Sequence, residues 1–390
     1  WTGINYTVVF NGNGSTGGSM ANQAFVYGTA QNLNANTYVR TGYTFSHWNT
    51  LPGGGGTNYS NNQNVNNLTT TPNGTYTLYA QWTPVEYTIT FHYIYAEATS
   101  SNGVTVTNVY YDTPYGSGGW PAGVSCPGYT FNGWNTAANG SGYSVESSTN
   151  FAEWGDTQIH TDLYAQWTSN TYYLTYDPEG GTVMPTGKTV TFGSAYGALP
   201  TPTRTGYTFL GWYNGDNGTG EQITTISVVS TPSDHTIYAK WQINSYTINF
   251  VENGGSTVTN ITQNYNTQVA KPANPTRTGY LFAEWYSDIG LTNLVTWPYT
   301  MGASNVDFYA KWTPITYTVT YNGNNATGGS TADSTHTYDI AKNLTANGYT
   351  RTGYSFLGWS LNAGAPTPSY ADQESVTNLS STNNAIVTFY

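Results

Sequence analysis

The stretch "RTGYTFLGW", Arg204 to Trp212, is one copy of a phrase that recurs along the 390-residue chain. The other copies read "RTGYTFSHW" from Arg40, "CPGYTFNGW" from Cys126, "RTGYLFAEW" from Arg277 and "RTGYSFLGW" from Arg351. Every arginine of the chain stands in this phrase, directly before Thr-Gly-Tyr. The phrase is therefore a repeated signature and not an isolated motif.

Two further phrases accompany the signature in a constant order. A closing phrase follows it and reads "LYAQW" from Leu78 and Leu163, "IYAKW" from Ile237 and "FYAKW" from Phe308. An alternating phrase opens each unit, as "YTVVF" from Tyr6, "YTITF" from Tyr87, "YYLTY" from Tyr172, "YTINF" from Tyr246 and "YTVTY" from Tyr317. Three phrases in one order predict a tandem array of five small domains.

The phrases also predict the boundaries of the repeats. Residues 1–5 form the tail of a preceding repeat, and the repeats span 6–84, 85–169, 170–243, 244–314 and 315–390, the last with an incomplete closing strand. Two interpretations follow. Either the chain is a window on a longer array, or consecutive subunits complete one another's strand through the assembly residues Trp1, Tyr6, Phe389 and Tyr390.

The composition limits the class of protein. Charged residues make up 7% of the chain, against about 25% in a typical soluble domain. No apolar run approaches the ~20 residues of a spanning helix, so membrane insertion is not expected. Aromatic residues at 16% argue against disorder and favour a β-rich core. The net charge of −11 argues against nucleic-acid binding, and the single cysteine excludes a disulfide within one chain.

Each repeat is predicted to consist mainly of strands. In the opening phrase of the first repeat, Tyr6, Val8 and Phe10 alternate with smaller side chains, as in a half-buried strand. The signature is expected to form a regular strand as well, with Phe209 on one face and Trp212 on the other. The closing phrase supplies the last strand.

Two tryptophan positions per repeat are expected to build much of the core. The residues of the structural signature are Arg40, Tyr43, Trp48, Trp82, Tyr129, Trp134, Trp167, Arg204, Tyr207, Trp212, Trp241, Arg277, Tyr280, Trp285, Trp312, Arg351, Tyr354 and Trp359. A guanidinium beside Gly-Tyr can stack on an aromatic ring or bond to carbonyls of the preceding turn. Repetition of the arginine predicts a structural latch, because a catalytic group is needed only once.

The stretch "PTRTGYTFLGW", Pro202 to Trp212, followed by "YAKW", resembles the Listeria–Bacteroides repeat and is similar to the B-repeat of listerial internalins. The resemblance covers essentially the whole chain. It implies compact, ubiquitin-like β-grasp units, strung as an elongated array on secreted or cell-surface proteins of bacteria or archaea. It implies no catalytic residues and no cofactor, and we expect the chain not to be an enzyme.

Candidate ligand sites are few. The stretch "EWGDTQIHTD" could surround a cation with Glu153, Asp156, His160 and Asp162, although acidic residues in a solvated loop are the simpler interpretation. The loops around Asp177 and Asp216 are oxygen-rich but lack a regular ligand spacing. A glycan platform on the surplus tryptophans Trp120, Trp154 and Trp297 is a further alternative, against packing between strands.

The function expected from the sequence is structural. The first hypothesis is a subunit of an extracellular filament, in which copies of the chain join head to tail by strand completion. The alternatives are a stalk segment of a large cell-surface adhesin and a glycan-binding repeat array. Partners would be copies of the chain itself, and for the alternatives environmental glycans or other surface proteins.

Overall fold

The computed structural model describes residues 1–93, 104–150 and 160–390, and for 104–108 the backbone alone. The chain divides into two compact units, which are described separately. The first comprises Trp1–Thr175, Lys188–Gly197 and Thr225–His235, and the second comprises Tyr176–Gly187, Ala198–Thr224 and Thr236–Tyr390. Strands dominate both units, and the described residues contain only two short 3-10 helices, η1 (Tyr115–Gly118) and η2 (Asp216–Gly218). Among the described residues, no helix is long and apolar enough to cross a membrane.

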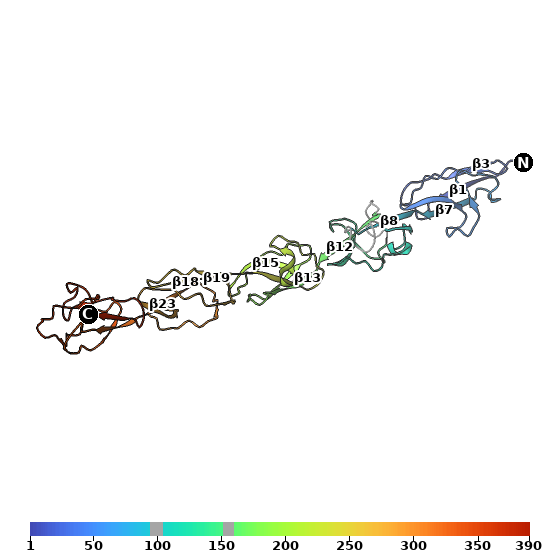
Figure 1. The fold of residues 1–390 in the computed structure, drawn as a ribbon. Coiled ribbons are helices and arrows are strands. Elements are labelled where there is room, and N and C mark those ends of the chain that lie inside the picture. Colours follow the sequence, from blue (N-terminus) through green and yellow to red (C-terminus); the bar gives the residue numbers. More distant parts are fainter. Residues whose placement is uncertain (94–103, 151–159) are drawn as a thin grey trace. The chain divides into compact units, whose positions relative to one another are not determined.

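The first repeat shows the sheet on which the others are variations. Its five strands lie in the order β2-β1-β7-β4-β5, that is Gln23–Val26, Asn5–Asn11, Thr75–Pro84, Tyr43–Asn49 and Asn58–Tyr59. The opening strand β1 and the closing strand β7 pair in parallel, from Thr7 opposite Thr75 to Asn11 opposite Tyr79, and lie side by side in Figure 1. All other pairs in this sheet are antiparallel.

The same arrangement recurs in the second and fourth repeats. The second has the order β11-β10-β12-β8-β9, with strands Ser144–Val145, Tyr129–Asn135, Asp162–Ser169, Glu86–His92 and Val104–Tyr110. The fourth has the order β19-β18-β23-β21, with strands Ile261–Asn264, Ser245–Val251, Val306–Pro314 and Tyr280–Tyr286. In both, the opening strand again runs parallel to the closing strand.

The third repeat contains β13 (Thr171–Asp177), β14 (Gly187–Thr191), β15 (Tyr207–Gly215), β16 (Thr219–Ile223) and β17 (His235–Ile243). Its signature strand β15 pairs antiparallel with both β16 and β17.

The first, fourth and fifth repeats also contain short two-stranded sheets beside the main one. These pair β3 (Gln31–Asn32) with β6 (Asn64–Val65), β20 (Gln268–Val269) with β22 (Tyr299–Thr300), β25 (Gly328–Gly329) with β28 (Tyr349–Thr350), and β27 (Lys342–Asn343) with β29 (Ser375–Val376).

The fifth repeat differs from the others at its signature. Its sheet has three strands, in the order β26 (Ser334–Thr337), β24 (Thr316–Tyr321) and β30 (Ile386–Phe389). The expectation that "GYSFLGW" forms a strand here is wrong, because only Trp359 makes a bridge, to Tyr370. In the fourth repeat the signature strand pairs with the second half of β23, whereas β30 ends at Phe389.

The opening strands follow from their alternation. In β1, Tyr6, Val8 and Phe10 are buried, while Thr7 and Val9 are only half-buried, which confirms the predicted pattern. Aromatic and β-branched side chains suit such a pleated, one-sided surface.

The signature strand does not alternate as predicted. A register shift between Phe209 and Gly211 inserts an extra residue, a β-bulge, opposite β17. Phe209 and Trp212 consequently contact each other, with ring centroids 5.5 Å apart, instead of facing opposite sides. Equivalent shifts occur at Phe45, Phe131 and Phe282. The bulge therefore gives each of these repeats a Phe–Trp pair on one face.

The two tryptophan positions differ in their environment. The signature tryptophans are buried in every repeat: Trp48, Trp134, Trp212, Trp285 and Trp359. The closing tryptophans are half-buried, and each donates its Nε1–H to a backbone carbonyl: Trp82 to Gly12, Trp167 to Tyr93, Trp241 to Pro178 and Trp312 to Glu252. The signature tryptophans fill the core of each repeat, and the closing tryptophans lie at the edge of that core.

Truncation of a signature tryptophan should unfold its own repeat. Trp285 is fully buried and contacts Phe250 and Phe282, so Trp285→Ala should cost about 3–5 kcal/mol. Hydrogen exchange should show lost protection in peptides from 244–314 while 6–84 stays protected. The matched control Leu281→Ala, at a 48% exposed position of the same repeat, should change stability by no more than about 0.5 kcal/mol. Equal protection in both variants would contradict the proposed core.

A buried histidine makes the fifth repeat sensitive to acid. The ring of His336 stacks on Tyr317 at 5.6 Å, and its Nε2 lies 2.9 Å from Ser334 Oγ. Its Nδ1 is buried and has no hydrogen-bond partner among the described residues. Burial, with a smaller contribution from Lys342, lowers the pKa of His336. The folded repeat therefore favours the neutral imidazole.

Since the pKa of His336 is lower in the folded than in the unfolded state, the unfolded chain binds the proton more readily. The contribution to stability is complete above pH about 6.5 and declines as the pH falls below that value. Hydrogen exchange in peptides from 315–390, corrected for the intrinsic exchange rate, should show this decline. His336→Gln should abolish it, and an unchanged decline in that variant would assign it to other groups.

Candidate functional site: the joints between repeats

The signature begins with a tight turn. The N–H of Tyr43 donates to the carbonyl of Arg40 at 3.0 Å, and the same bond recurs at the other four signatures with 3.1 Å. The intervening glycine has a positive φ, for example +75° at Gly42 and +77° at Gly279. A left-handed backbone conformation at this position of a turn favours glycine, because any other residue would be strained there by its Cβ. The turn explains why Gly precedes Tyr in all five copies.

The arginine of the turn stacks on the tyrosine that ends it. The distance from Cζ to the ring centroid is 3.8 Å for Arg40 on Tyr43, and it is 3.9, 3.8 and 4.2 Å at the three remaining arginines, Arg204, Arg277 and Arg351. Two of the guanidinium groups also donate to carbonyls of the preceding loop, Arg204 to Glu179 and Arg277 to Asn253. The second repeat has the buried Cys126 in place of the arginine and keeps the turn.

The glycine of each turn receives an aromatic ring from the following repeat. In the first unit, a Cβ at Gly42 would lie 2.0 Å from the ring of Tyr111, and one at Gly128 would lie 2.3 Å from Phe192. In the second unit, the pairs are Gly206 with Tyr265 at 2.2 Å and Gly279 with Tyr338 at 2.3 Å. A side chain at these glycines would occupy the place of the ring. We call this contact the joint.

Backbone hydrogen bonds hold each joint in register. The carbonyl of Gly42 accepts the N–H of Val85, and the carbonyl of Val85 accepts the N–H of Tyr111. The same two bonds recur at the other three joints through the linker residues Asn170, Asn244 and Ile315, with N–O distances of 2.8 to 3.0 Å. One linker residue therefore bonds to the repeat before it and to the aromatic residue after it.

The signature tyrosine completes two of the joints with its hydroxyl group. Tyr43 Oη donates to Asp112 at 2.6 Å, and Tyr280 Oη donates to Asp339 at 2.7 Å. These hydrogen bonds to carboxylates raise the pKa of both tyrosines, so the hydroxyls stay protonated and donate at neutral pH. The hydrogen bond from Tyr280, together with a further one from Asn378, lowers the pKa of Asp339. A charge-assisted bond of this kind is stronger than one between neutral groups.

The sequence analysis identified the signature arginine and tyrosine, but it missed both the turn between them and the aromatic residue that packs on the turn. The joint aromatics follow the second strand of each repeat and precede a small or acidic residue, in Tyr111-Asp112, Phe192-Gly193, Tyr265-Asn266 and Tyr338-Asp339. This recurrence is visible in the sequence. Its meaning was hidden because the ring packs on a glycine of the preceding repeat and not within its own.

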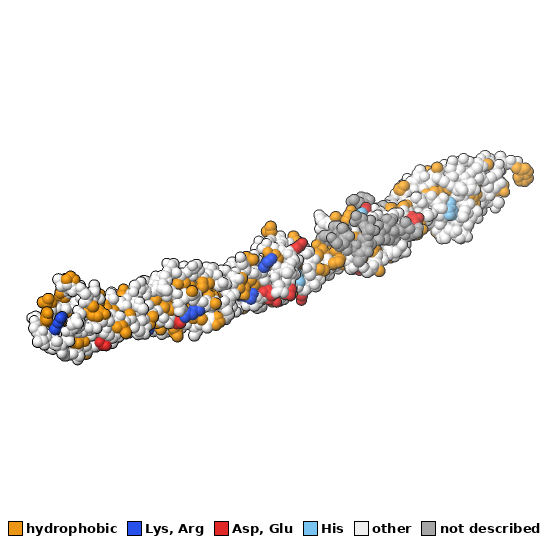
Figure 2. Space-filling model, in the orientation of Figure 1, with side chains coloured by type: hydrophobic (Ala, Val, Ile, Leu, Met, Phe, Trp, Pro, Cys, Tyr) orange, Lys and Arg blue, Asp and Glu red, His pale blue; other side chains and the backbone are white. Residues whose placement is uncertain are grey.

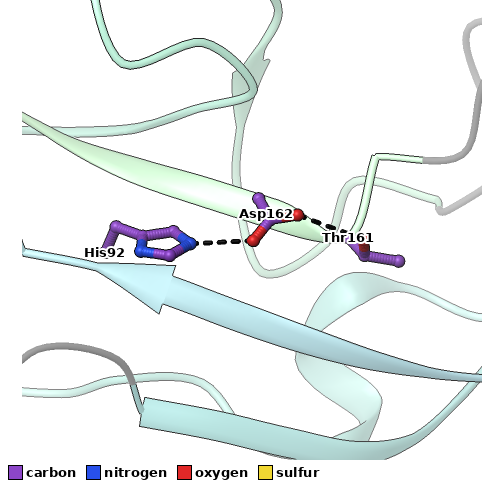
Figure 3. Close-up of polar contacts among 3 residues, drawn as sticks. All are labelled: His92, Thr161 and Asp162. Atoms are coloured by element: carbon purple, nitrogen blue, oxygen red, sulfur yellow. Dashed lines mark hydrogen bonds and ion pairs between the residues drawn. The ribbon is translucent and has the colours of Figure 1, made fainter.

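The predicted cation site is not assembled among the described residues. Glu153 and Asp156 lie outside the described residues. Asp162 Oδ1 lies 2.8 Å from His92 Nε2, and Asp162 Oδ2 accepts a hydrogen bond from the hydroxyl of Thr161 (Figure 3). The ring of His160 lies against Tyr143 instead. Within the described ranges, no group of three or more His, Cys, Asp or Glu side chains could hold a metal ion.

The two oxygen-rich loops use their carboxylates internally. Asp177 Oδ1 accepts the N–H of Glu179 at 2.9 Å, and Glu179 Oε1 accepts the N–H of Asn217 at 2.8 Å. Asp216 Oδ2 accepts the Asn217 amide at 3.1 Å. These bonds stabilise loop conformations.

Two of the surplus tryptophans pack against core rings. Trp120 meets Phe91 edge-on at 5.3 Å, and Trp297 meets Phe308 at 5.8 Å, both as partly buried members of a core cluster. Trp154 lies outside the described residues. The face in Figure 2 is mostly white, with few charged side chains, in keeping with the 7% charged composition. Trp120 and Trp297 therefore each pack edge-on within their own repeat.

Comparison with known proteins places these repeats in a family. The family model described as the Listeria-Bacteroides repeat domain matches residues 6–81, 87–166, 172–240, 246–311 and 317–385. The chain is 32% identical over 324 residues to a protein of Evansella cellulosilytica named "Putative Gly-rich membrane protein", covering 82% of the chain and 36% of that protein.

Two further relatives have lower coverage of this chain. A second Evansella cellulosilytica protein, named "Putative membrane protein", is 31% identical over 73% of the chain and 40% of its own length. Internalin H of Listeria monocytogenes is 30% identical over 49% of the chain and 35% of its own length. The chain thus matches two fifths or less of the length of each relative.

The joint glycine can be tested against a matched glycine of the same repeat. Gly279→Ala places a Cβ at a positive φ and against Tyr338, so both the turn and the joint should be strained, by about 1–3 kcal/mol. Gly302→Ala meets no atom within 4 Å and serves as the control. Hydrogen exchange should show lost protection at Ile315 and Tyr338 in the first variant alone. Equal protection in the two variants would show that Gly279 does not hold a joint with Tyr338.

Proposed function

The chain belongs to the Listeria–Bacteroides repeat family, and we propose that it is a non-enzymatic spacer: a stalk segment of a larger surface protein. The observation that carries the proposal is the joint, which uses the same turn, glycine carbonyl and ring at all four boundaries. A repeated joint with two backbone hydrogen bonds restricts the motion between neighbouring repeats. Such restriction is what a spacer requires and what a flexible linker lacks.

The use of the recurring side chains supports a structural role. The signature arginines stack on tyrosines, the signature tryptophans fill the cores, and the closing tryptophans bond to backbone carbonyls. The repeated arginines and tryptophans are thus engaged in packing, and the turn glycines of the first four repeats are engaged in joints. Function in this chain is therefore assigned to the array and not to a single pocket.

We further assign each repeat to a β-grasp-like fold. Support comes from the strand order, since a β-grasp sheet places its first and last strands in parallel at the centre of a mixed sheet. β1 and β7 occupy those positions, with β2 and β4 outside them. The repeats lack the α-helix of ubiquitin within the residues that the structure describes.

An extracellular location at the surface of a bacterium or archaeon fits these features. Two relatives are named as membrane proteins, and the matched region makes up two fifths or less of each, as expected for one part of a larger protein. The low charge and abundance of Asn, Thr, Ser and Gly resemble the composition of surface proteins.

A filament is the second candidate, in which chains associate head to tail. The observation in its favour is the joint itself, which shows that repeats of this kind associate through a ring, a glycine and two backbone hydrogen bonds.

Small-angle X-ray scattering tests the spacer proposal. Truncating three joint rings together, with Tyr111→Ala, Tyr265→Ala and Tyr338→Ala, should loosen three joints and lower the radius of gyration of the full chain. A control with Tyr143→Ala and Tyr173→Ala, at positions 43% and 48% exposed, should scatter like the unmodified chain. Circular dichroism checks that the repeats remain folded. If the unmodified chain scatters like the joint variant, the joints do not stiffen the array and the spacer role fails.

A further inference from the structure

An ionisable pair of rings lies in the fifth repeat directly beyond its joint with the fourth. Tyr317 on β24 is opposite His336 on β26, and the two buried rings stack at 5.6 Å with 22° between their planes. In the first repeat, Tyr6 and Phe25 occupy the same register positions and stack at 5.5 Å and 18°. The imidazole of His336 therefore takes a place that an apolar ring fills in the first repeat.

The surroundings of His336 favour a neutral ring. Its Nε2 lies 2.9 Å from Ser334 Oγ, and its buried Nδ1 has no hydrogen-bond partner among the described residues. The phenol of Tyr317 faces the ring from β24, and the positive charge of Lys342 acts on it from β27. Within the part of the chain that the structure describes, no ion pair includes His336.

The two carboxylates that flank β26 do not pair with His336. Asp333 is exposed, and Asp339 accepts hydrogen bonds from the Tyr280 hydroxyl and the Asn378 amide. Both nitrogens of a protonated imidazole are donors, and Ser334 Oγ is an acceptor for only one of them. The second N–H would remain buried without an acceptor, which disfavours the folded arrangement.

The edge position of β26 provides a way to relieve this cost. The sheet has the order β26-β24-β30, so β26 can separate while β24 stays paired with β30. Tyr338 follows β26 directly, covers Gly279 of the fourth repeat and donates its N–H to the carbonyl of Ile315 at 3.0 Å. Separation of β26 consequently withdraws the ring that closes this joint.

The other three joints lack a titratable group at this place. The residue two positions before the joint aromatic is Val109, Val190 and Gln263 in the second, third and fourth repeats, and His336 in the fifth. None of the first three side chains changes its charge with pH. A response to acid through this position is therefore confined to the boundary between the fourth and fifth repeats.

We propose that His336 makes the joint between the fourth and fifth repeats open in mild acid. Uptake of a proton by its ring releases β26 from β24 and draws Tyr338 away from Gly279, while the other three joints remain closed. The array consequently gains one mobile boundary in acidic surroundings and loses it again at neutral pH. The inference rests on the joint as the element that restricts motion in the proposed spacer, and it adds a condition that releases one joint.

The pH range of the response follows from linkage. The closed joint holds the pKa of His336 below its usual value, so the open form binds the proton more readily. The ratio of open to closed form should rise about tenfold for each pH unit below about 6.5, until the pH reaches the lowered pKa of the closed form. Asp339 stays ionised in this range because its pKa is lowered, so protonation of its bond with Tyr280 does not account for the opening.

Hydrogen exchange of the full chain, followed by NMR from pH 7.5 to 5.5 and corrected for the intrinsic rate, tests the proposal. Protection of the Tyr338 N–H should fall about tenfold per pH unit below about 6.5. The Tyr111 N–H, which makes the same bond at the first joint, should keep its protection, and so should the Thr318 N–H, which donates to the Ala385 carbonyl. Constant protection at Tyr338, or an equal loss at Thr318 through unfolding of the whole repeat, would overturn the proposal.

Two variants taken from other repeats identify the responsible group. His336→Phe reproduces Phe25, and His336→Gln reproduces Gln263, so each places a non-titrating side chain that the fold already accepts at this position. Both should protect the Tyr338 N–H equally at pH 5.5 and 7.5, and the glutamine variant decides if the phenylalanine variant is not folded at pH 7.5. A persistent decline would overturn the proposal. A joint effect on scattering at neutral pH, without an acid effect at Tyr338, would reject this inference and leave the spacer role intact.

Discussion

The array depends on one backbone constraint, the left-handed glycine in the turn before each signature tyrosine. Its positive φ turns the chain into the signature strand, and its missing side chain leaves room for a ring of the next repeat. Its carbonyl then accepts the N–H of the linker residue. One residue thus sets the direction of a strand within its repeat and the position of the repeat that follows. The stacked arginine reinforces the turn but is dispensable, since Cys126 replaces it in the second repeat.

Much of the fold follows from the sequence because the repeats provide five readings of the same pattern. The mainly β class, the five repeats and the buried face of β1 could be predicted from alternation and from recurring phrases. The bulge at Phe209 could not be predicted in this way. An alternating sequence reads the same with or without an extra residue opposite the partner strand, so it does not reveal the shift in register. In the structure, the register shift is accompanied by contact between the rings of Phe209 and Trp212.

The joint was less predictable than the core for a physical reason. A core position reveals itself by periodicity within one segment, whereas Tyr338 and Gly279 belong to different repeats and are linked only by contact. The missing strand at the fifth signature has a similar origin. Strand pairing depends on a partner, and the phrase "GYSFLGW" reads the same whether or not a partner lies beside it.

The parallel pairing of opening and closing strands has a mechanical consequence. When the two ends of a repeat are pulled apart, the load enters at the start of β1 and leaves at the end of β7, which run side by side in the same direction. The force acts along these strands, so the ladder from Thr7–Thr75 to Asn11–Tyr79 is sheared and its bonds share the load. Antiparallel neighbours pulled at one end would instead unzip bond by bond. Resistance to tension is therefore built into the connectivity of the first, second, fourth and fifth repeats.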